Sequence, residues 1–184
     1  MKKHQKLLSL CIGALCVALS LCLSYLKIPI GVAFAGFGGS IDLVMIPLIV
    51  YAVYAGWGWG ICAGVVFGTL KFFLAGGVAV NWQSMLLDYS VAYAFVGFAG
   101  IARRSGKLWL CALTGCAARF LVHFFSGITI YAILIPTEIL GLVTGSAALY
   151  SVLYNGTYML PNTVLAVVLC ALLKKPVAKI LKMK

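Results

Sequence analysis

The feature that most constrains this chain is a series of long apolar runs, separated by short segments that hold most of its charged residues. A helix needs about 20 predominantly apolar residues to cross the hydrocarbon core of a bilayer, and several runs reach that length. Of the 184 residues, 64% are hydrophobic and only 9% are charged, so the composition lies outside the range of soluble globular proteins. The sequence therefore predicts an all-α membrane protein.

Six membrane-spanning helices fit the apolar runs, and we expect them to form one integral-membrane domain over residues 1–184. Their expected bounds are residues 7–25, 42–54, 58–75, 82–102, 109–131 and 147–173. Pro47 should kink or tilt the short second span. Before that span, residues 27–40 combine Pro29 with several glycines and are predicted to form a flexible loop that can act as a lid.

The basic residues predict on which side of the membrane each end of the chain lies. The apolar run after Lys6 continues to about Tyr25 without a small-residue cleavage site, so we expect it to be retained as the first span. With the N-terminus inside, only Lys27 falls in an outer loop, and the inner segments hold Lys2, Lys3, Lys6, Arg103, Arg104, Lys107, Lys174, Lys175, Lys179, Lys182 and Lys184. An excess of Lys and Arg marks cytoplasmic segments, so both termini are predicted to be cytoplasmic.

Asp88 is one of only three acidic residues, and it lies within the apolar run of the fourth span. A carboxylate at membrane depth is costly, which makes a functional site the default interpretation and a structural pairing with Arg or Lys the alternative. At a rise of 1.5 Å per residue from the span ends, Asp88, His123 and Asn155 lie about 10–12 Å below the outer surface. Polar side chains from three helices are therefore expected at one depth.

Aromatic residues accompany these polar side chains, and Gly127 and Tyr131 follow His123 on one helical face. A cavity lined by aromatic rings with a few polar groups is the usual make-up of a small-molecule site. The alternatives are an ordinary packing role for His123 and membrane-interface positions for the tyrosines. The aromatic residues that share helices with the three polar side chains are Trp82, Tyr89, Tyr131, Tyr150 and Tyr154.

Three further charged residues lie in or beside the predicted spans. Asp42 is expected at the outer mouth of the second span. Lys71 is expected to extend its ammonium group toward the membrane interface, as lysines near helix ends do. Arg119, one helical turn from His123, is a potential partner that neutralises Asp88.

Several chemistries are missing from the sequence. It has no GxxxxGKS/T loop for ATP and no HExxH or GxSxG motif, so we expect no enzyme. The cysteines lie inside apolar runs without metal-ligand spacing, so we expect no metal site and no cofactor. The six spans also lack the doubled halves of a large secondary transporter. The sequence predicts a membrane-embedded binder that needs partners to move its ligand.

Several stretches resemble the thiamine-specific substrate-binding subunit, or S component, of energy-coupling-factor (ECF) vitamin transporters. The combination is more specific than any single stretch, and the resemblance covers nearly the whole chain. The matching stretches are Ala14 with Ala18, Leu87-Asp88-Tyr89, Gly97-Phe98-Ala99-Gly100, His123-Phe124-Phe125-Ser126-Gly127 and Tyr150-Ser151-Val152-Leu153-Tyr154-Asn155-Gly156.

The resemblance implies a six-helix bundle in the bacterial cytoplasmic membrane that captures thiamine, as ligand and not as cofactor, from outside. It implies docking through Ala14 and Ala18 on a shared transmembrane coupling subunit that is driven by two ATP-binding-cassette ATPases. Trp82 is a further candidate for stacking on the ligand. By motif, the resemblance assigns ligand contacts to Asp88, Tyr89, His123, Gly127, Tyr131, Tyr150 and Asn155.

Three positions depart from the family pattern. Asp88 stands in place of a Glu, Tyr131 in place of a Trp, and Gly38 lies near the position of an aromatic lid residue. A shorter acid and a smaller ring widen the expected pocket. Two alternatives stay open, namely an S component for another vitamin such as riboflavin or biotin, and a structural or regulatory membrane protein whose polar residues only hold helices together.

Overall fold

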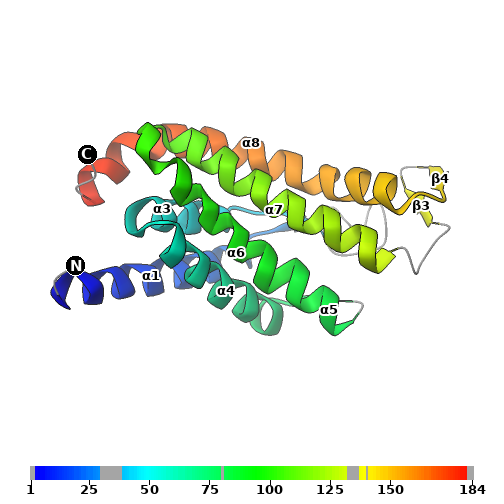
Figure 1. The fold of residues 1–184 in the computed structure, drawn as a ribbon, viewed down its shortest axis with the longest axis horizontal. Coiled ribbons are helices and arrows are strands. Elements are labelled where there is room, and N and C mark those ends of the chain that lie inside the picture. Colours follow the sequence, from blue (N-terminus) through cyan, green and yellow to red (C-terminus); the bar gives the residue numbers. More distant parts are fainter. Residues whose placement is uncertain (1–2, 30–38, 80, 132–136, 140, 182–184) are drawn as a thin grey trace.

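The computed structural model describes residues 3–29, 39–79, 81–131, 137–139 and 141–181, which form an elongated helical bundle (Figure 1). Two pairs of short antiparallel strands accompany the helices. The helices are α1 (Lys3–Leu23), α3 (Met45–Ala55), α4 (Trp57–Leu74), α5 (Trp82–Met85), η1 (Leu86–Val91), α6 (Ala92–Val96), η2 (Gly97–Ser105), α7 (Leu108–Tyr131) and α8 (Ala147–Leu181). Strand β1 (Ile28–Pro29) pairs with β2 (Ser40–Ile41), and β3 (Thr137–Ile139) pairs with β4 (Leu142–Thr144).

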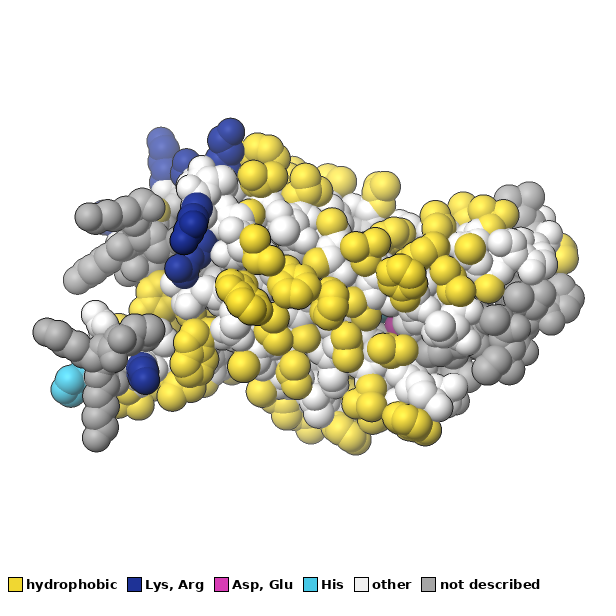
Figure 2. All heavy atoms as spheres, in the orientation of Figure 1, with side chains coloured by type: hydrophobic (Ala, Val, Ile, Leu, Met, Phe, Trp, Pro, Cys, Tyr) yellow, Lys and Arg dark blue, Asp and Glu magenta, His cyan; other side chains and the backbone are white. Residues whose placement is uncertain are grey.

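The predicted all-α membrane class is confirmed. Hydrophobic side chains cover the middle of the surface in Figure 2, as expected for a lipid-facing belt. The helix of the predicted second span, α3, is apolar but has only 11 residues, about half the length that crosses a bilayer core. Within the described residues, five stretches are long and apolar enough to cross a membrane: His4–Leu23, Trp57–Leu74, Trp82–Ser105, Leu108–Thr129 and Ala147–Lys179.

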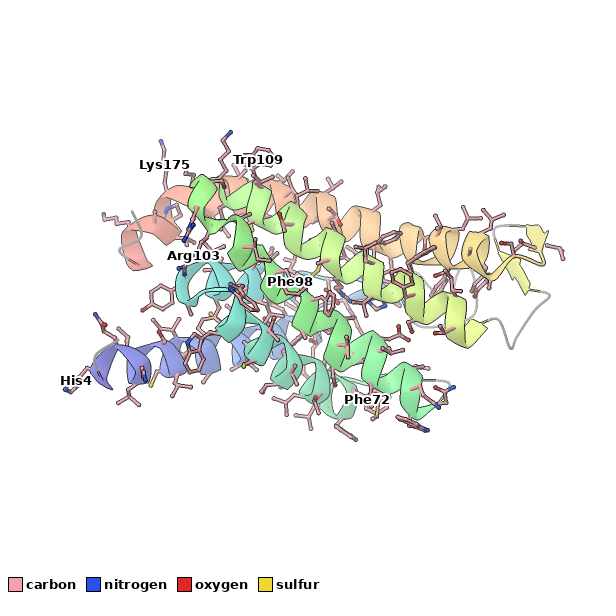
Figure 3. All side chains as sticks on the ribbon, in the orientation of Figure 1. His4, Phe72, Phe98, Arg103, Trp109 and Lys175 are labelled. Carbon is pink, nitrogen blue, oxygen red and sulfur yellow. The ribbon has the colours of Figure 1, made fainter. Side chains whose placement is uncertain are left out.

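Basic side chains gather at one end of the molecule, where both chain ends lie (Figure 2). Arg103 and Lys175 lie at this end, as does His4 (Figure 3). The last helix, α8, continues through the lysines that follow Leu173, beyond the predicted end of the sixth span. Lysine is a good helix former, so its charge ends a membrane span without ending the helix.

The fourth span is not a uniform α-helix. After α5, the chain widens into the π-helix η1, and after α6 it tightens into the 3₁₀-helix η2. Short π-helical turns inside helices are rare and occur frequently at functional sites. Because η1 contains Asp88 and Tyr89, the irregular turn coincides with the residues that the sequence singles out.

A glycine stripe on α4 allows this span to approach closely. A β-carbon at Gly64 would collide with the backbone of Tyr93, and one at Gly68 with the backbone of Tyr89. Small residues let two helix backbones come together in this way. Gly64 and Gly68 therefore hold η1 and α6 close against α4.

The two ends of the predicted loop of residues 27–40 form a strand pair. Ile28 of β1 pairs with Ile41 of β2, whereas residues 30–38, including Gly38, lie outside the described residues. The Lys27 ammonium donates a hydrogen bond to the carbonyl of Ala75 over 3.1 Å, just after the end of α4. A cation near helix C-terminal carbonyls is stabilising, so this bond ties the β1 end of the loop to α4.

Candidate ligand-binding site

A cavity of about 250 Å³ lies between α4, η1, α6, α7 and α8, and the β1–β2 pair forms part of its wall. This volume is just below the range typical of small-molecule sites. Its lining combines aromatic rings with polar groups, which is the composition that the sequence predicts. The aromatic residues that line it are Tyr89, Tyr93, Tyr154 and Tyr158.

Asp88 and His123 form the polar centre of this cavity. Nδ1 of His123 lies 3.2 Å from Oδ1 of Asp88, and 25% of the Asp88 side-chain surface is exposed. Nε2 of His123 is buried without a hydrogen-bond partner among the described residues. Asn155 of α8 lines the same cavity, so the structure brings together the three polar residues that were expected at one depth.

Asn155 also joins α7 to α8. Its Nδ2 donates hydrogen bonds to the carbonyl oxygens of His123, over 3.2 Å, and Ser151, over 2.9 Å. Its Oδ1 accepts a hydrogen bond of 2.6 Å from the hydroxyl of Tyr158. The amide therefore orients both the helix that carries His123 and one of the cavity tyrosines.

Tyr89 holds the connection between α4 and α5 against the cavity. Its hydroxyl accepts a hydrogen bond from the amide of Val78 over 2.8 Å and donates one to the carbonyl of Val78 over 3.1 Å. Val78 itself lines the cavity. Tyr89 thus contributes a ring to the site and fixes a backbone segment of the cavity wall.

Lys71 lines the cavity, although its ammonium group was expected at the membrane interface. It is 7% exposed, and its ammonium donates hydrogen bonds to Asp42 over 2.8 Å and to the Tyr93 hydroxyl over 2.7 Å. The expectation that it extends to the membrane interface is wrong, because a buried carboxylate offers it a closer partner. The signal was present in the sequence, since charged residues inside apolar spans usually face the interior of the bundle.

Arg119 also lines the cavity and is 6% exposed. Its guanidinium carbon lies 4.1 Å from the ring centroid of Tyr93, while its Nε and Nη1 have no hydrogen-bond partner among the described residues. The expected pairing of Arg119 with Asp88 is not found, because Asp88 bonds to His123 and Asp42 bonds to Lys71. A cation with unpartnered donors therefore faces the cavity.

Three other predicted site residues, Trp82, Gly127 and Tyr150, are not among the described residues that line the cavity, and the prediction for Tyr131 is not tested. Trp82 is 66% exposed and precedes the π-helical turn. Gly127 packs so closely on Ser151 that a β-carbon would collide with that side chain. Tyr150 stacks on Tyr154 with ring centroids 5.8 Å apart. The side chain of Tyr131, the last residue of α7, lies outside the described part of the chain.

The arrangement suits a ligand that is aromatic and carries hydrogen-bond donors or positive charge. Asp88 is a carboxylate acceptor, the tyrosine rings offer π-faces, and Arg119 supplies donors to an acceptor atom. Among the described residues, no three His, Cys, Asp or Glu side chains are grouped so that they can hold a metal ion.

Known proteins resemble this chain over most of its length. A model of the thiamine transporter protein family (Thia_YuaJ) matches residues 10–182. The thiamine transporter ThiT of Bacillus subtilis (strain 168) is 28% identical over 151 residues, which cover 73% of this chain and 75% of that protein. The thiamine transporter ThiT of Lacticaseibacillus paracasei is 25% identical over 190 aligned positions, which cover 94% and 90% of the two chains.

A solved structure has the same fold. ThiT from Listeria monocytogenes superposes with a TM-score of 0.80 at 23% identity, over 96% of this chain and 98% of that one. At this identity the likeness concerns the fold alone. The family model, in contrast, spans nearly the entire sequence, and this chain therefore belongs to the thiamine transporter protein family.

Proposed function

We propose that this chain binds thiamine and acts as the substrate-binding subunit of an ATP-driven ECF vitamin importer. The family is a transport family and not an enzyme family, and the chain is a multi-pass protein of the cell membrane. The observation that carries the proposal is the Asp88–His123 pair in a cavity walled by four tyrosines. We take residues 1–184 as one binding domain.

Thiamine has the chemistry that this cavity complements. It combines a permanently charged thiazolium ring with an aminopyrimidine whose amino group donates hydrogen bonds. Asp88 offers an acceptor with negative charge, Nε2 of His123 is buried and unpartnered among the described residues, and Tyr89 offers a ring face. Asn155 is the fourth proposed contact, since it lines the same cavity.

The remaining candidate residues are proposed to act at the edge of the site. Tyr150 supports the cavity ring of Tyr154 by stacking, and Gly127 lets α7 and α8 come close enough to close the site. Tyr131 and Trp82 are proposed as outer stacking residues. Trp82 is exposed, so contact with thiamine requires α5 to shift.

We further propose six membrane spans with both termini in the cytoplasm. In this topology, α3 crosses only part of the bilayer, and the β1–β2 pair, which precedes α3, covers the rest of the crossing. Non-helical backbone is tolerated at membrane depth where protein buries it. The clustering of basic side chains at the end that holds both termini supports this orientation (Figure 2).

The energising partners are proposed to dock on α1. Gly13, Val17 and Ser20 form the buried face of this helix, whereas Ala14 and Ala18 are exposed. Their small side chains permit close approach of another helix. The expected partner is the ECF transmembrane coupling subunit with its two ATP-binding-cassette ATPases.

Equilibrium binding to a vitamin panel tests the proposal. Purified protein is titrated with thiamine, riboflavin and biotin, and binding is followed by quenching of the intrinsic tryptophan fluorescence. We expect saturable binding of thiamine alone. Saturation by riboflavin or biotin at lower concentration would assign the site to that vitamin, and no binding of any of the three would favour a structural or regulatory role.

A further inference from the structure

Strand β2 is a non-helical wall of the cavity. Gly39 and Ser40 line it, and a β-carbon on Gly39 would lie 2.8 Å from the ring of Tyr158, which lines it too. Two-stranded ladders are marginally stable on their own, and each strand of this pair has only two residues. Side chains from the surrounding helices must therefore hold β2 in place.

Asn162 on α8 bonds to β2 as a neighbouring strand would. Its Oδ1 accepts a hydrogen bond from the backbone amide of Asp42 over 2.9 Å, and its Nδ2 donates one to the carbonyl of Ser40 over 2.8 Å. Asn162 is 2% exposed, so water does not compete for these bonds. One side chain thus satisfies a donor and an acceptor of the wall backbone.

Asp42, the residue that follows β2, ties the same segment to α4. Its Oδ2 accepts hydrogen bonds from the ammonium of Lys71 over 2.8 Å and from the hydroxyl of Ser40 over 3.3 Å. The strand is consequently held from two helices, by an amide on α8 and by an ion pair on α4. Both attachments act within three residues of the cavity wall.

We infer that Asn162 is a positioning residue that holds β2 against the bound ligand and so sets the rate at which the ligand leaves. That the ligand is thiamine rests on the proposed function, but the role of Asn162 in holding β2 does not depend on which ligand binds. Helical walls satisfy their backbone hydrogen bonds internally, whereas β2 depends on a few side-chain bonds, so it can open locally while the helices stay intact. Differences in affinity between closely related complexes reside mostly in the dissociation rate.

Stopped-flow kinetics of thiamine binding test this inference. Asn162→Leu removes both hydrogen bonds to the wall backbone while keeping the branching and the number of side-chain heavy atoms, and we expect dissociation to become about tenfold faster with association nearly unchanged. Thr163→Val is the matched control, because it removes a hydrogen bond of 2.7 Å to the Met159 carbonyl within α8 and Thr163 is not among the described residues that line the cavity. The control should release thiamine at the parent rate.

Hydrogen exchange on the parent protein gives a second readout that needs no variant. The backbone amide hydrogen of Asp42 should exchange slowly. It should exchange more slowly still with thiamine bound, because the bound ligand stabilises the wall segment in its closed position. If the parent binds thiamine and Asn162→Leu releases it at the parent rate, the inference is refuted. It is also refuted if thiamine does not change the exchange rate of the Asp42 amide. A parent that binds no thiamine refutes the proposed function instead, and the exchange measurement with the vitamin that does bind then decides the role of Asn162.

Discussion

Asp88 has one hydrogen-bond partner among the described residues, Nδ1 of His123, and its second carboxylate oxygen is available to a ligand. Asp88→Asn removes the charge and one acceptor while keeping the shape. We expect thiamine affinity to fall by about 30-fold to several thousand-fold, or roughly 2–5 kcal/mol, because buried donors on the ligand lose their acceptor. Thiamine titration beside a melting curve in detergent measures this change.

Asp42 provides the control for Asp88. Its carboxylate pairs with Lys71 and does not line the cavity, so Asp42→Asn should lower the melting temperature, while the affinity of the folded protein for thiamine should fall less than in Asp88→Asn. A well-folded Asp88→Asn variant that binds thiamine as tightly as the parent would end the proposed role of Asp88.

Lys71 and Arg119 are two buried cations whose environments predict opposite responses to removal. Lys71→Met strands the Asp42 carboxylate, and breaking a buried pair in this way costs about 3–5 kcal/mol of unfolding free energy. Arg119→Met removes a cation whose Nε and Nη1 have no partner among the described residues, so the melting temperature of the ligand-free protein should stay the same or rise. Equal destabilisation by both changes would contradict this assignment.

At the scale of elements, the contact between α4 and the fourth span depends on glycine. Gly64→Ala places a methyl group against the backbone of Tyr93, which cannot move aside as a flexible side chain can. We expect a lower melting temperature and weaker thiamine binding, because α6 carries Tyr93 into the cavity wall. Gly58→Ala is the control on the same helix, since a β-carbon there meets nothing within 4 Å and alanine favours the helix. Equal melting temperatures for both variants would show that the contact tolerates a methyl group.

The helical class and the convergence of Asp88, His123 and Asn155 could be predicted, because span length and depth follow from counting residues. The rotation of a helix about its axis could not. Trp82 precedes Tyr89 by two α-helical turns and would share its face in a uniform helix, but the π-helical turn between them holds more residues and rotates that face. Trp82 became a candidate because it shares a helix with Asp88 and Tyr89, but the structure leaves it exposed.

The polar wall of the cavity was harder to predict because it joins distant segments. Asn162 meets Ser40 and Asp42 across 120 or more positions of sequence. Lys71 and Arg119 were visible as charges inside apolar runs, yet their partners depend on which helices are neighbours. The close approach of α4 to α6 fixes that arrangement, and it depends on glycines spaced four residues apart on α4.

At the scale of the whole molecule, the chain offers a site for a ligand but no motif for binding ATP in the usual way. We expect vesicles that contain this protein alone to bind thiamine without accumulating it against a gradient. Adding the coupling subunit and both ATPases with ATP should produce accumulation, measured with radiolabelled thiamine. ATP-driven accumulation by the protein alone would rule out the proposal that this chain binds thiamine and its partners supply the energy for transport.

The exposed face of α1 determines whether binding and transport can be separated by mutation. Ala14→Trp or Ala18→Trp places a bulky ring where a partner helix is proposed to pack, so uptake should be abolished while thiamine affinity stays at the parent value. Leu15→Trp is the matched control, because Leu15 is also exposed but lies about a quarter turn away around α1. If the alanine variants lose thiamine binding while complex assembly is unchanged, α1 supports the site itself; if the control also abolishes uptake, the partner covers a wider face of the helix than the two alanines define.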